Sequence, residues 1–248
     1  MQRSMKRWWV TLGSAVWLSA AVGAAGCGTS GDGTTPVVTG GGGSGSGGDP
    51  GPAQTTTGPY EPLTVGASWT YHVNDTGVVY DKVSTVEATE DAGGMFAGVT
   101  VFRVHDHFPA EEQNTWYQVD GSVVKRLHED VLNGALLKSE DWFSPFRLRV
   151  DETAEHMVAG AAWTMSYMDT ASNPPKAVTM TAKSDAWRVD GVDEMVSVPF
   201  GTFMSLHVTR TDPSDGSTKS FWFVRGVGKV KEQTSGGHKE ELAAYAAP

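Results

Sequence analysis

Residues 66–73 read Gly-Ala-Ser-Trp-Thr-Tyr-His-Val, and their pattern is the strongest indication of the fold. In an extended chain successive side chains point to opposite faces, so Trp69 and Tyr71 share one face while Thr70 and His72 share the other. One apolar face and one polar face are typical of a β-strand that packs one side on a core. The glycine allows a tight turn before the strand, and Trp69 supplies a large apolar anchor. The stretch therefore predicts a strand that helps to build a β core.

The same opening occurs a second time in the chain. Residues 160–170 match residues 66–76 at six of eleven positions, with Trp163 in the place of Trp69. Later in each half an aromatic pair precedes a Val-Lys pair at one spacing: Trp116-Tyr117 with Val124-Lys125, and Trp222-Phe223 with Val230-Lys231. These matches predict two related β units, over about residues 60–150 and 151–248. We expect Trp69 and Trp163 to be buried at equivalent places.

Short alternating runs rich in Val, Thr and aromatic residues recur between Gly-containing turns, a pattern that predicts strands. The expected strands are residues 68–74, 78–89, 98–107, 115–127, 163–169, 177–189, 203–211, 217–224 and 229–234. No stretch predicts a long helix. Residues 129–138 are compatible with one or two helical turns, but Asn133-Gly134 interrupts them, so a loop or hairpin fits equally well.

Together these patterns predict an all-β domain over residues 59–248, with antiparallel strands in a curled sheet, a barrel or a sandwich. Each unit alone is too small to bury its aromatic face well, so packing the two units together buries more apolar surface. The sequence leaves open which of the three arrangements is formed.

The N-terminus predicts export and lipid attachment. Arg3, Lys6 and Arg7 precede an apolar run that ends in small residues, which is the layout of a secretory signal peptide over residues 1–26. Cys27, the only cysteine, follows Ala-Ala-Gly directly and resembles the lipidation site of bacterial lipoproteins, except that Ala24 stands where Leu is usual. The resemblance implies that Cys27 carries lipid and anchors the mature chain to a membrane. The alternative is a secreted protein with an incidental cysteine.

Residues 27–58 predict a disordered tether, because 12 of the 31 residues after Cys27 are Gly and most of the others are Ser, Thr or Pro. A Gly-rich coil of this length has a root-mean-square span of roughly 30 Å. The whole chain has 19 Lys and Arg residues against 29 Asp and Glu residues, for a net charge of −10. Such a surface repels nucleic acid, so we expect no nucleic-acid partner.

Further motifs of the folded part resemble a family of bacterial lipoproteins and periplasmic proteins. The carrying residues are the G-x-x-W-T opening, Val-Pro-Phe-Gly-Thr-Phe at 198–203, Gly-Val-Gly-Lys-Val-Lys at 226–231, and Glu241-Leu242 with Tyr245. The resemblance implies an antiparallel, curved β fold and brings no catalytic residues. The first half departs from it, because Met-Phe-Ala-Gly at 95–98 stands where the second half has the Val-Pro motif.

His105 and His107 are the sharpest candidates for chemistry. At a strand end their i, i+2 spacing projects both imidazoles from one face, which begins a zinc or copper site, with Glu111 or Glu112 as a third ligand. The plainer interpretation is a polar strand end that enters a loop, and it is the one we favour. In the same way, Gly226 and Gly228 fit a bulge or tight bend better than a ligand contact. Lys229 and Lys231 are then expected on the solvent face of the next strand.

The sequence contains no G-x-S-x-G or H-E-x-x-H motif, so we predict a protein that is not an enzyme and needs no cofactor. The expected function is a lipid-anchored envelope lipoprotein that acts as a non-enzymatic interaction or structural module. One alternative is a carrier or sensor that binds an apolar ligand within the curved sheet, and another is a metal-binding protein that uses His105 and His107. Gly28 follows Cys27 where Asp would signal inner-membrane retention, so outer-membrane attachment is predicted, on either side of that membrane.

Overall fold

The computed structural model describes residues 57–248, which belong to one compact unit. Its strands are β1 (Ser68–Asp75), β2 (Val78–Asp91), β3 (Thr100–His107), β4 (Glu112–Asp120), β5 (Val123–Asn133), β6 (Leu136–Asp151), β7 (Ala162–Ser172), β8 (Thr179–Val198), β9 (Gly201–Thr211), β10 (Thr218–Val224), β11 (Gly228–Thr234) and β12 (His238–Ala246). A short 3₁₀ helix, η1 (Gly94–Phe96), lies between β2 and β3. Within the described residues no helix is long and apolar enough to cross a membrane.

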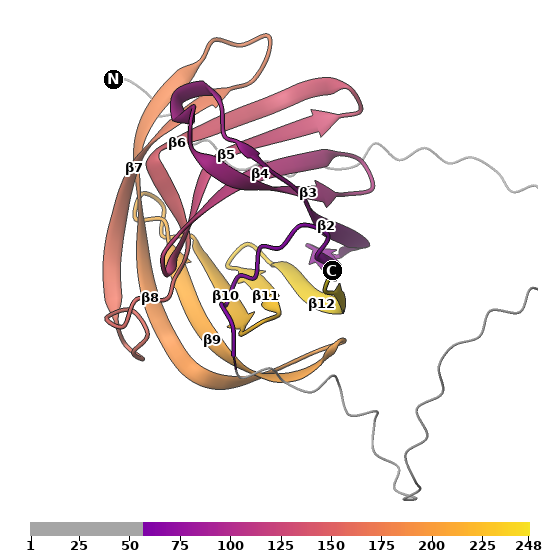
Figure 1. Cartoon of the computed structure of the whole chain (residues 1–248), viewed down its shortest axis with the longest axis vertical. Coiled ribbons are helices and arrows are strands. Elements are labelled where there is room, and N and C mark those ends of the chain that lie inside the picture. Colours follow the sequence, from indigo (N-terminus) through magenta and orange to yellow (C-terminus); the bar gives the residue numbers. More distant parts are fainter. Residues whose placement is uncertain (1–56) are drawn as a thin grey trace, which may run out of the picture. The chain divides into compact units, whose positions relative to one another are not determined.

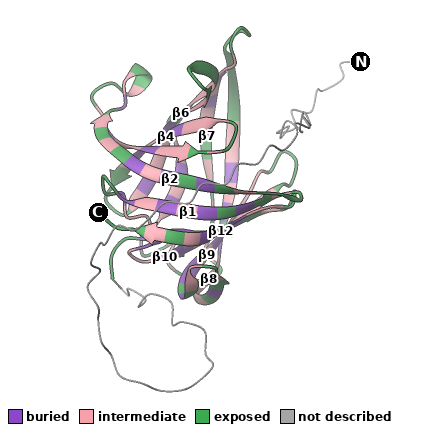
Figure 2. Cartoon of the chain, turned by 90° about the vertical axis from the view of Figure 1, so that its right-hand side faces the viewer, coloured by how far each residue is buried: buried purple, intermediate pink, exposed green. Residues whose placement is uncertain are grey.

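Each strand pairs antiparallel with the next one along the chain, and β12 pairs with β1, so the strands form a closed barrel. Figure 1 shows this ring of strands, with the indigo segment before β1 running across it. The predicted all-β antiparallel fold is therefore confirmed, and of the three arrangements left open the chain adopts the barrel. The predicted strand at residues 68–74 is β1, where buried and more exposed positions alternate as expected (Figure 2).

The two halves of the barrel repeat the same local geometry at their first strands. Val86 forms backbone hydrogen bonds with residues 66–67, with N···O distances of 2.8 and 2.9 Å. Val189 forms the same two bonds, at the same distances, with residues 160–161. Trp69 and Trp163 are accordingly the second residues of β1 and β7. Trp69 is buried as predicted, whereas Trp163 is only half-buried.

The main core lies inside the barrel. It includes Trp69, Trp187, Phe203 and Phe223, and it also takes in Tyr60 from the segment of residues 57–67 that precedes β1. This segment is held at one end of the barrel, since the Pro59 carbonyl accepts a 2.9 Å hydrogen bond from the Gly226 amide in the β10–β11 turn. Burial of these large side chains is the principal source of stability for a chain whose described part has no disulfide.

The expected set of nine strands lacks three of the twelve that form. Residues 115–127, expected as one strand, belong to β4 and β5, because the chain turns at Gly121-Ser122. The other two missing strands are β6 and β12. The stretch considered for a helix or a loop, residues 129–138, forms the β5–β6 hairpin with Asn133-Gly134 at its turn. Residues 238–246 form β12, although Glu, Leu and Ala dominate this stretch and favour helices in isolation. Pairing with β1 along eight residues overrides that preference.

Candidate functional site

The barrel interior contains a cluster of buried ion pairs, which the sequence did not predict. Lys229 Nζ lies 2.8 Å from Glu232 Oε2 and 2.6 Å from Glu240 Oε2. Lys82 Nζ lies 2.6 Å from the same Glu240 oxygen. All four side chains are buried, and the Tyr71 hydroxyl beside them donates to the Lys229 carbonyl at 2.9 Å. Strands β1, β2, β11 and β12 thus bring two carboxylates and two ammonium groups together at the seam of the barrel.

Mutual attraction keeps these groups charged despite burial. Burial alone would raise the pKa of Glu240, but Lys229 and Lys82 hold that pKa well below its ordinary value. Burial also acts to raise the pKa of Glu232, and Lys219 and Lys229 outweigh it, so this pKa is lowered too. The cluster is therefore a set of compensated charges rather than a free acid or base.

Lys229 contradicts the expectation that it faces solvent, and the cause is a β-bulge. Trp222 pairs with Lys231 but Phe223 pairs with Lys229, so Val230 is the extra residue on β11. The bulge turns Lys229 inward beside Phe223 while Lys231 stays on the outer face with Trp222. The sequence signal for this was the pair Gly226 and Gly228, which was correctly interpreted as a bulge or bend, but the expectation that both lysines face solvent is wrong for Lys229.

The first half contains a matching ion pair beside a matching bulge. Trp116 pairs with His128 and Tyr117 pairs with Arg126, which makes Leu127 the extra residue on β5. Arg126 Nη1 donates to Glu129 three residues later at 2.5 Å, as Lys229 does to Glu232. The structural counterpart of the Val230 position is therefore Leu127, so the equal spacing of Val124-Lys125 and Val230-Lys231 does not mark equivalent residues.

Three donor residues in this region could in principle hold a metal. Among residues 57–248, Glu232, His238 and Glu240 are the one group whose ligand atoms all lie within 4.8 Å of one another. Their carboxylates, however, already contact ammonium groups, including Lys219 Nζ at 2.6 Å from Glu232 Oε1. A divalent cation here would face the positive charge of these lysines at close range, so the geometry disfavours a metal.

The predicted metal candidates lie elsewhere and share one carboxylate. Glu112 places Oε2 at 2.9 Å from His105 Nε2 and Oε1 at 2.6 Å from His107 Nδ1. His105 Nδ1 also lies 3.0 Å from the side-chain oxygen of Asn114. Glu111 turns away and contacts Lys138. The structure thus brings together His105, His107 and Glu112 as acid–imidazole pairs, and it does not bring in Glu111.

A further cluster, made by His207, Trp222 and Glu194, lies where β8, β9 and β10 meet. The His207 ring stacks on Trp222 at 4.2 Å between centroids, and its Nδ1 lies 2.8 Å from Glu194 Oε2. Trp222 Nε1 donates to the other Glu194 oxygen at 3.2 Å. In the first half, Trp116 Nε1 donates to Glu90 Oε1 at 2.6 Å in the same way. These side chains fix one another, which is a structural role.

One end of the barrel carries exposed apolar side chains on three hairpins. In an antiparallel meander the turns after odd-numbered strands all lie at the same end, so the β1–β2, β5–β6 and β7–β8 turns share it. Val79 is 72% exposed, Leu136 is 74% exposed and Met180 is 70% exposed. The set, which we name the apolar rim, consists of Val78, Val79, Leu136, Leu137, Val178 and Met180. Residues 57–67 are held at the opposite end of the barrel, beside the β10–β11 turn.

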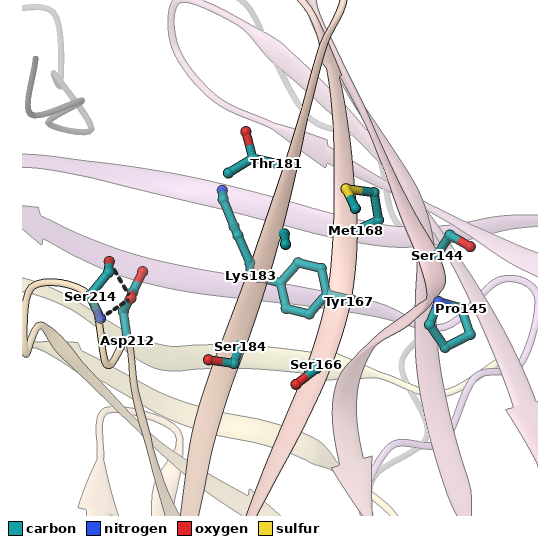
Figure 3. Close-up of a pocket in the computed structure, with 11 residues that line it drawn as sticks. Ser144, Pro145, Ser166, Tyr167, Met168, Thr181, Lys183, Ser184, Asp212 and Ser214 are labelled. Carbon is teal, nitrogen blue, oxygen red and sulfur yellow. Dashed lines mark hydrogen bonds between the residues drawn. The ribbon is translucent and has the colours of Figure 1, made fainter. Parts of the chain in front are cut away.

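The wall of the barrel is incomplete between β6 and β7. Their pairing runs only from Glu140↔Ser172 to Ser144↔Met168, although both strands continue beyond it. A hollow of about 630 Å³ lies where the pairing ends (Figure 3). Its lining comes from β6, β7, β8 and the β9–β10 loop: Ser144, Pro145, Ser166, Tyr167, Met168, Thr181, Ala182, Lys183, Ser184, Asp212 and Ser214. Lys183 is neutralised by Asp169 at 2.5 Å.

Cys27 and the predicted signal peptide lie outside the described residues. No family model, curated protein or solved structure matches this chain.

Proposed function

We propose that this chain is a lipid-anchored cell-envelope lipoprotein of the outer membrane, and that its barrel is a non-enzymatic module that binds another envelope protein. The leader and Cys27 support the anchor. The apolar rim carries the binding proposal, because three turns at the same end of the barrel each expose two apolar residues, a surface that a partner would bury.

The net charge of the chain favours a protein partner over an anionic membrane, and the rim lies apart from the point where the predicted tether would join the barrel. The chain enters the barrel at the opposite end, through residues 57–67, which contact Glu152 and Arg225 there. Residue 57, where the predicted tether would join the barrel, therefore lies at the end opposite the rim, so a partner bound at the rim would not collide with the point of attachment. The net charge of −10 disfavours contact of the rim with an anionic headgroup surface.

Site-specific photocrosslinking in the native host tests the binding proposal. A photoreactive residue at Val79, Leu136 or Met180 should capture one and the same envelope protein. The matched control is Met195, which is as exposed as Val79 at 72% but lies on β8 near the other end of the barrel. Absence of any captured protein from all three rim positions, or equal capture from Met195, would contradict the proposal.

Membrane fractionation tests the anchor separately. The wild-type chain should fractionate with outer membranes, and Cys27→Ser should be released from membranes because its thiol cannot be acylated. A Cys27→Ser protein that stays membrane-bound and fully processed would show that the leader was interpreted wrongly.

The carrier and metal alternatives remain weaker proposals. An apolar ligand inside the barrel would meet Lys229, Arg147 and Arg149 with their acidic partners, and burying apolar surface against such groups gains little. Native mass spectrometry after exposure to envelope lipids tests the carrier, and a persistent ligand-free mass would remove it. For the metal, zinc should raise the melting temperature of the wild type but not that of a variant with His105 and His107 changed to Ala.

A further inference from the structure

The gap between β6 and β7 leaves one edge of β7 without a partner strand. Residues 162–167 of β7 pair with β8 on one side, from Ala162↔Arg188 to Tyr167↔Lys183. On the other side, no strand among residues 57–248 pairs with them, because the β6 ladder begins only at Met168. An unpaired strand edge is a ready template for another chain in extended conformation.

The hydrogen bonds already formed show which groups face the gap. The Val189 amide donates to the Ala161 carbonyl at 2.9 Å, so this carbonyl points to β8. Residues of an antiparallel strand direct their backbone groups alternately to the two sides. Trp163, Met165 and Tyr167 therefore direct their backbone groups to β8. The N–H and C=O groups of Ala162, Thr164 and Ser166 face the gap, and the side chains of these three residues are exposed.

The first half of the barrel shows what such an edge accepts. There β1 is paired along its whole length with β12, from Ser68↔Ala246 to Asp75↔His238. The covering residues 242–246 read Leu-Ala-Ala-Tyr-Ala, and Tyr245 stacks on Trp69 with 5.6 Å between ring centroids. A small or apolar strand is thus the occupant of the equivalent place.

In the second half no strand in the described part of the chain covers residues 162–167 of β7, and a loop side chain occupies only the position that corresponds to Tyr245 of β12. His156, from the β6–β7 loop, stacks on Trp163 at 3.7 Å between centroids, as Tyr245 does on Trp69. The neighbouring residues have no such cover, which explains why Trp163 is half-buried and Trp69 is buried. The buried indole N–H of Trp163 has no hydrogen-bond partner among the described residues.

The gap between β6 and β7 is crossed by an ion pair, and it adjoins the hollow. Arg147 of β6 reaches across to Asp185 of β8, with Nε 2.9 Å from Oδ2, and its guanidinium lies 5.4 Å from the centre of the Tyr167 ring. The hollow described above begins at Ser144 and Ser166, where the β6–β7 pairing stops (Figure 3). Ser144, Ser166 and Ser184 line the hollow with short side chains, which suits the close approach of a peptide backbone.

We propose that the open edge of β7 at residues 162–167 is a docking slot for an extended peptide segment of another envelope protein. The segment adds a strand between β6 and β7, and its alternating side chains are small or apolar, as in residues 242–246. This inference rests on the proposed function, for which it names a binding surface and the conformation of the partner.

A peptide taken from the chain itself is the first probe. A fluorescently labelled Glu-Leu-Ala-Ala-Tyr-Ala-Ala peptide, which copies residues 241–247, should bind the full-length mature protein saturably with 1:1 stoichiometry in an anisotropy titration. The same peptide with alternate amides N-methylated should bind far more weakly, because it cannot pair with a strand edge. Equal binding of the two peptides, or no saturable binding of the first, would overturn the slot.

Thr164→Pro and Thr164→Ala form a matched pair of variants. Proline removes the Thr164 N–H, which faces the gap, and no hydrogen bond to β8, whereas alanine changes the exposed side chain and keeps that N–H. Losing one such bond with a carbonyl left unpaired corresponds to roughly a 5- to 100-fold weaker affinity. We expect that loss for Thr164→Pro and less than about a twofold change for Thr164→Ala. Unchanged affinity of a folded Thr164→Pro would contradict the proposal.

Hydrogen exchange tests whether the peptide binds at the open edge of β7, even if the proline variant does not fold. In the wild type the amides of Thr164 and Ser166 should exchange fast without the peptide and slowly with it, while the amides of Trp163 and Met165 stay slow throughout. Protection that appears elsewhere would overturn the slot. Failure of the slot leaves rim crosslinking intact, and failure of rim crosslinking leaves peptide binding intact, so the two proposals fail separately.

Discussion

At the scale of single residues, the interior ion pairs are the least expected feature. A buried ion pair adds little net stability, but removing one partner leaves an uncompensated charge and costs about 3–5 kcal/mol. Glu240 accepts from both Lys82 and Lys229, so each lysine depends on it. The cluster therefore makes the fold sensitive to single substitutions at positions that an inspection of polarity alone would assign to the surface.

Glu240→Gln should lower the free energy of unfolding by about 3 kcal/mol or more, because two buried ammonium groups then lose a carboxylate. The matched control is Glu241→Gln on the outer face, where Lys239 is the nearest partner at 2.9 Å. Partly exposed pairs contribute about 0–1 kcal/mol, so this control should change little. Urea unfolding of both variants measures the difference, and equal effects would show that the cluster is not held together as described.

Asp141, unlike Glu240, should destabilise the fold when it is ionised, so its substitution should raise stability at high pH. Burial, with Asp169 and Glu129 nearby, raises the pKa of Asp141 to about 6 from an ordinary value of 3.8. Ionisation in the folded state is thus unfavourable, and the cost develops as the pH rises from about 4 through 6. Asp141→Asn should be more stable than wild type at pH 8, by about 1 kcal/mol after allowance for solvent screening, and should show no advantage at pH 4. Thermal melts across this range measure the effect. A constant difference at every pH would contradict it.

At the scale of elements, the strands that the sequence predicted are those in which apolar and polar residues alternate. Trp69 and Tyr71 predict β1 because they make one face of this strand apolar. In β6 the inner face carries Arg147 and Arg149, and in β12 it carries Glu240, so the usual period-two signal is absent. Only the partners on distant strands make these faces interior, and a single sequence does not display those partners.

The candidate site was predictable to a still smaller extent. His105, His107 and Glu112 do meet, as their spacing at a strand end indicated. The open edge of β7 could not be inferred, because it depends on where the β6–β7 pairing stops rather than on any residue type. The repeat indicated that the strands beginning near Trp69 and Trp163 are equivalent, but it contained no information about the strand that covers the edge of each.

The 3₁₀ helix η1 gives a test at this scale, because two adjacent glycines differ in the space around them. Gly93 and Gly94 both have positive φ angles, 65° and 49°, so any side chain is strained at either position. A Cβ atom at Gly94 would lie 2.4 Å from the Trp142 ring, whereas a Cβ atom at Gly93 would have no other heavy atom within 4 Å. Gly93→Ala should therefore cost the backbone strain alone, about 1–3 kcal/mol, because φ 65° with ψ −166° is a conformation that essentially only glycine adopts. Gly94→Ala should cost about 1–3 kcal/mol more, in line with overpacking. Chemical denaturation compares them, and similar costs would mean that η1 does not pack on Trp142.

At the scale of the whole molecule, residues 57–67 complete one end of the barrel. Arg149 Nη2 lies 3.0 Å from Glu61 Oε1, and the Tyr60 amide donates to Glu152 Oε1 at 2.7 Å. Tyr60 and Leu63 belong to the same core as the barrel strands. The segment is therefore part of the folded unit, although the sequence places it next to the predicted tether and partly within it.

Glu61→Gln should loosen this segment, because Arg149 would lose its ionic partner inside the barrel. Limited proteolysis should then cut within residues 57–67 several times faster than in the wild type, while the strands stay protected. Glu155→Gln, at an exposed position in the β6–β7 loop, serves as the control and should leave the cleavage rate unchanged. If both variants are cut at the wild-type rate, the ion pair does not secure the segment.

The seating of residues 57–67 also determines how the molecule responds to mechanical load. A pull on the chain before residue 57 acts first on the Pro59–Gly226 hydrogen bond and the Glu61–Arg149 pair, and only afterwards on the β1 ladders with β2 and β12. A few local contacts yield before eight paired residues on each side of β1 can be sheared. Under tension the segment would thus detach and extend first, which lengthens the chain by a short amount and leaves the barrel closed.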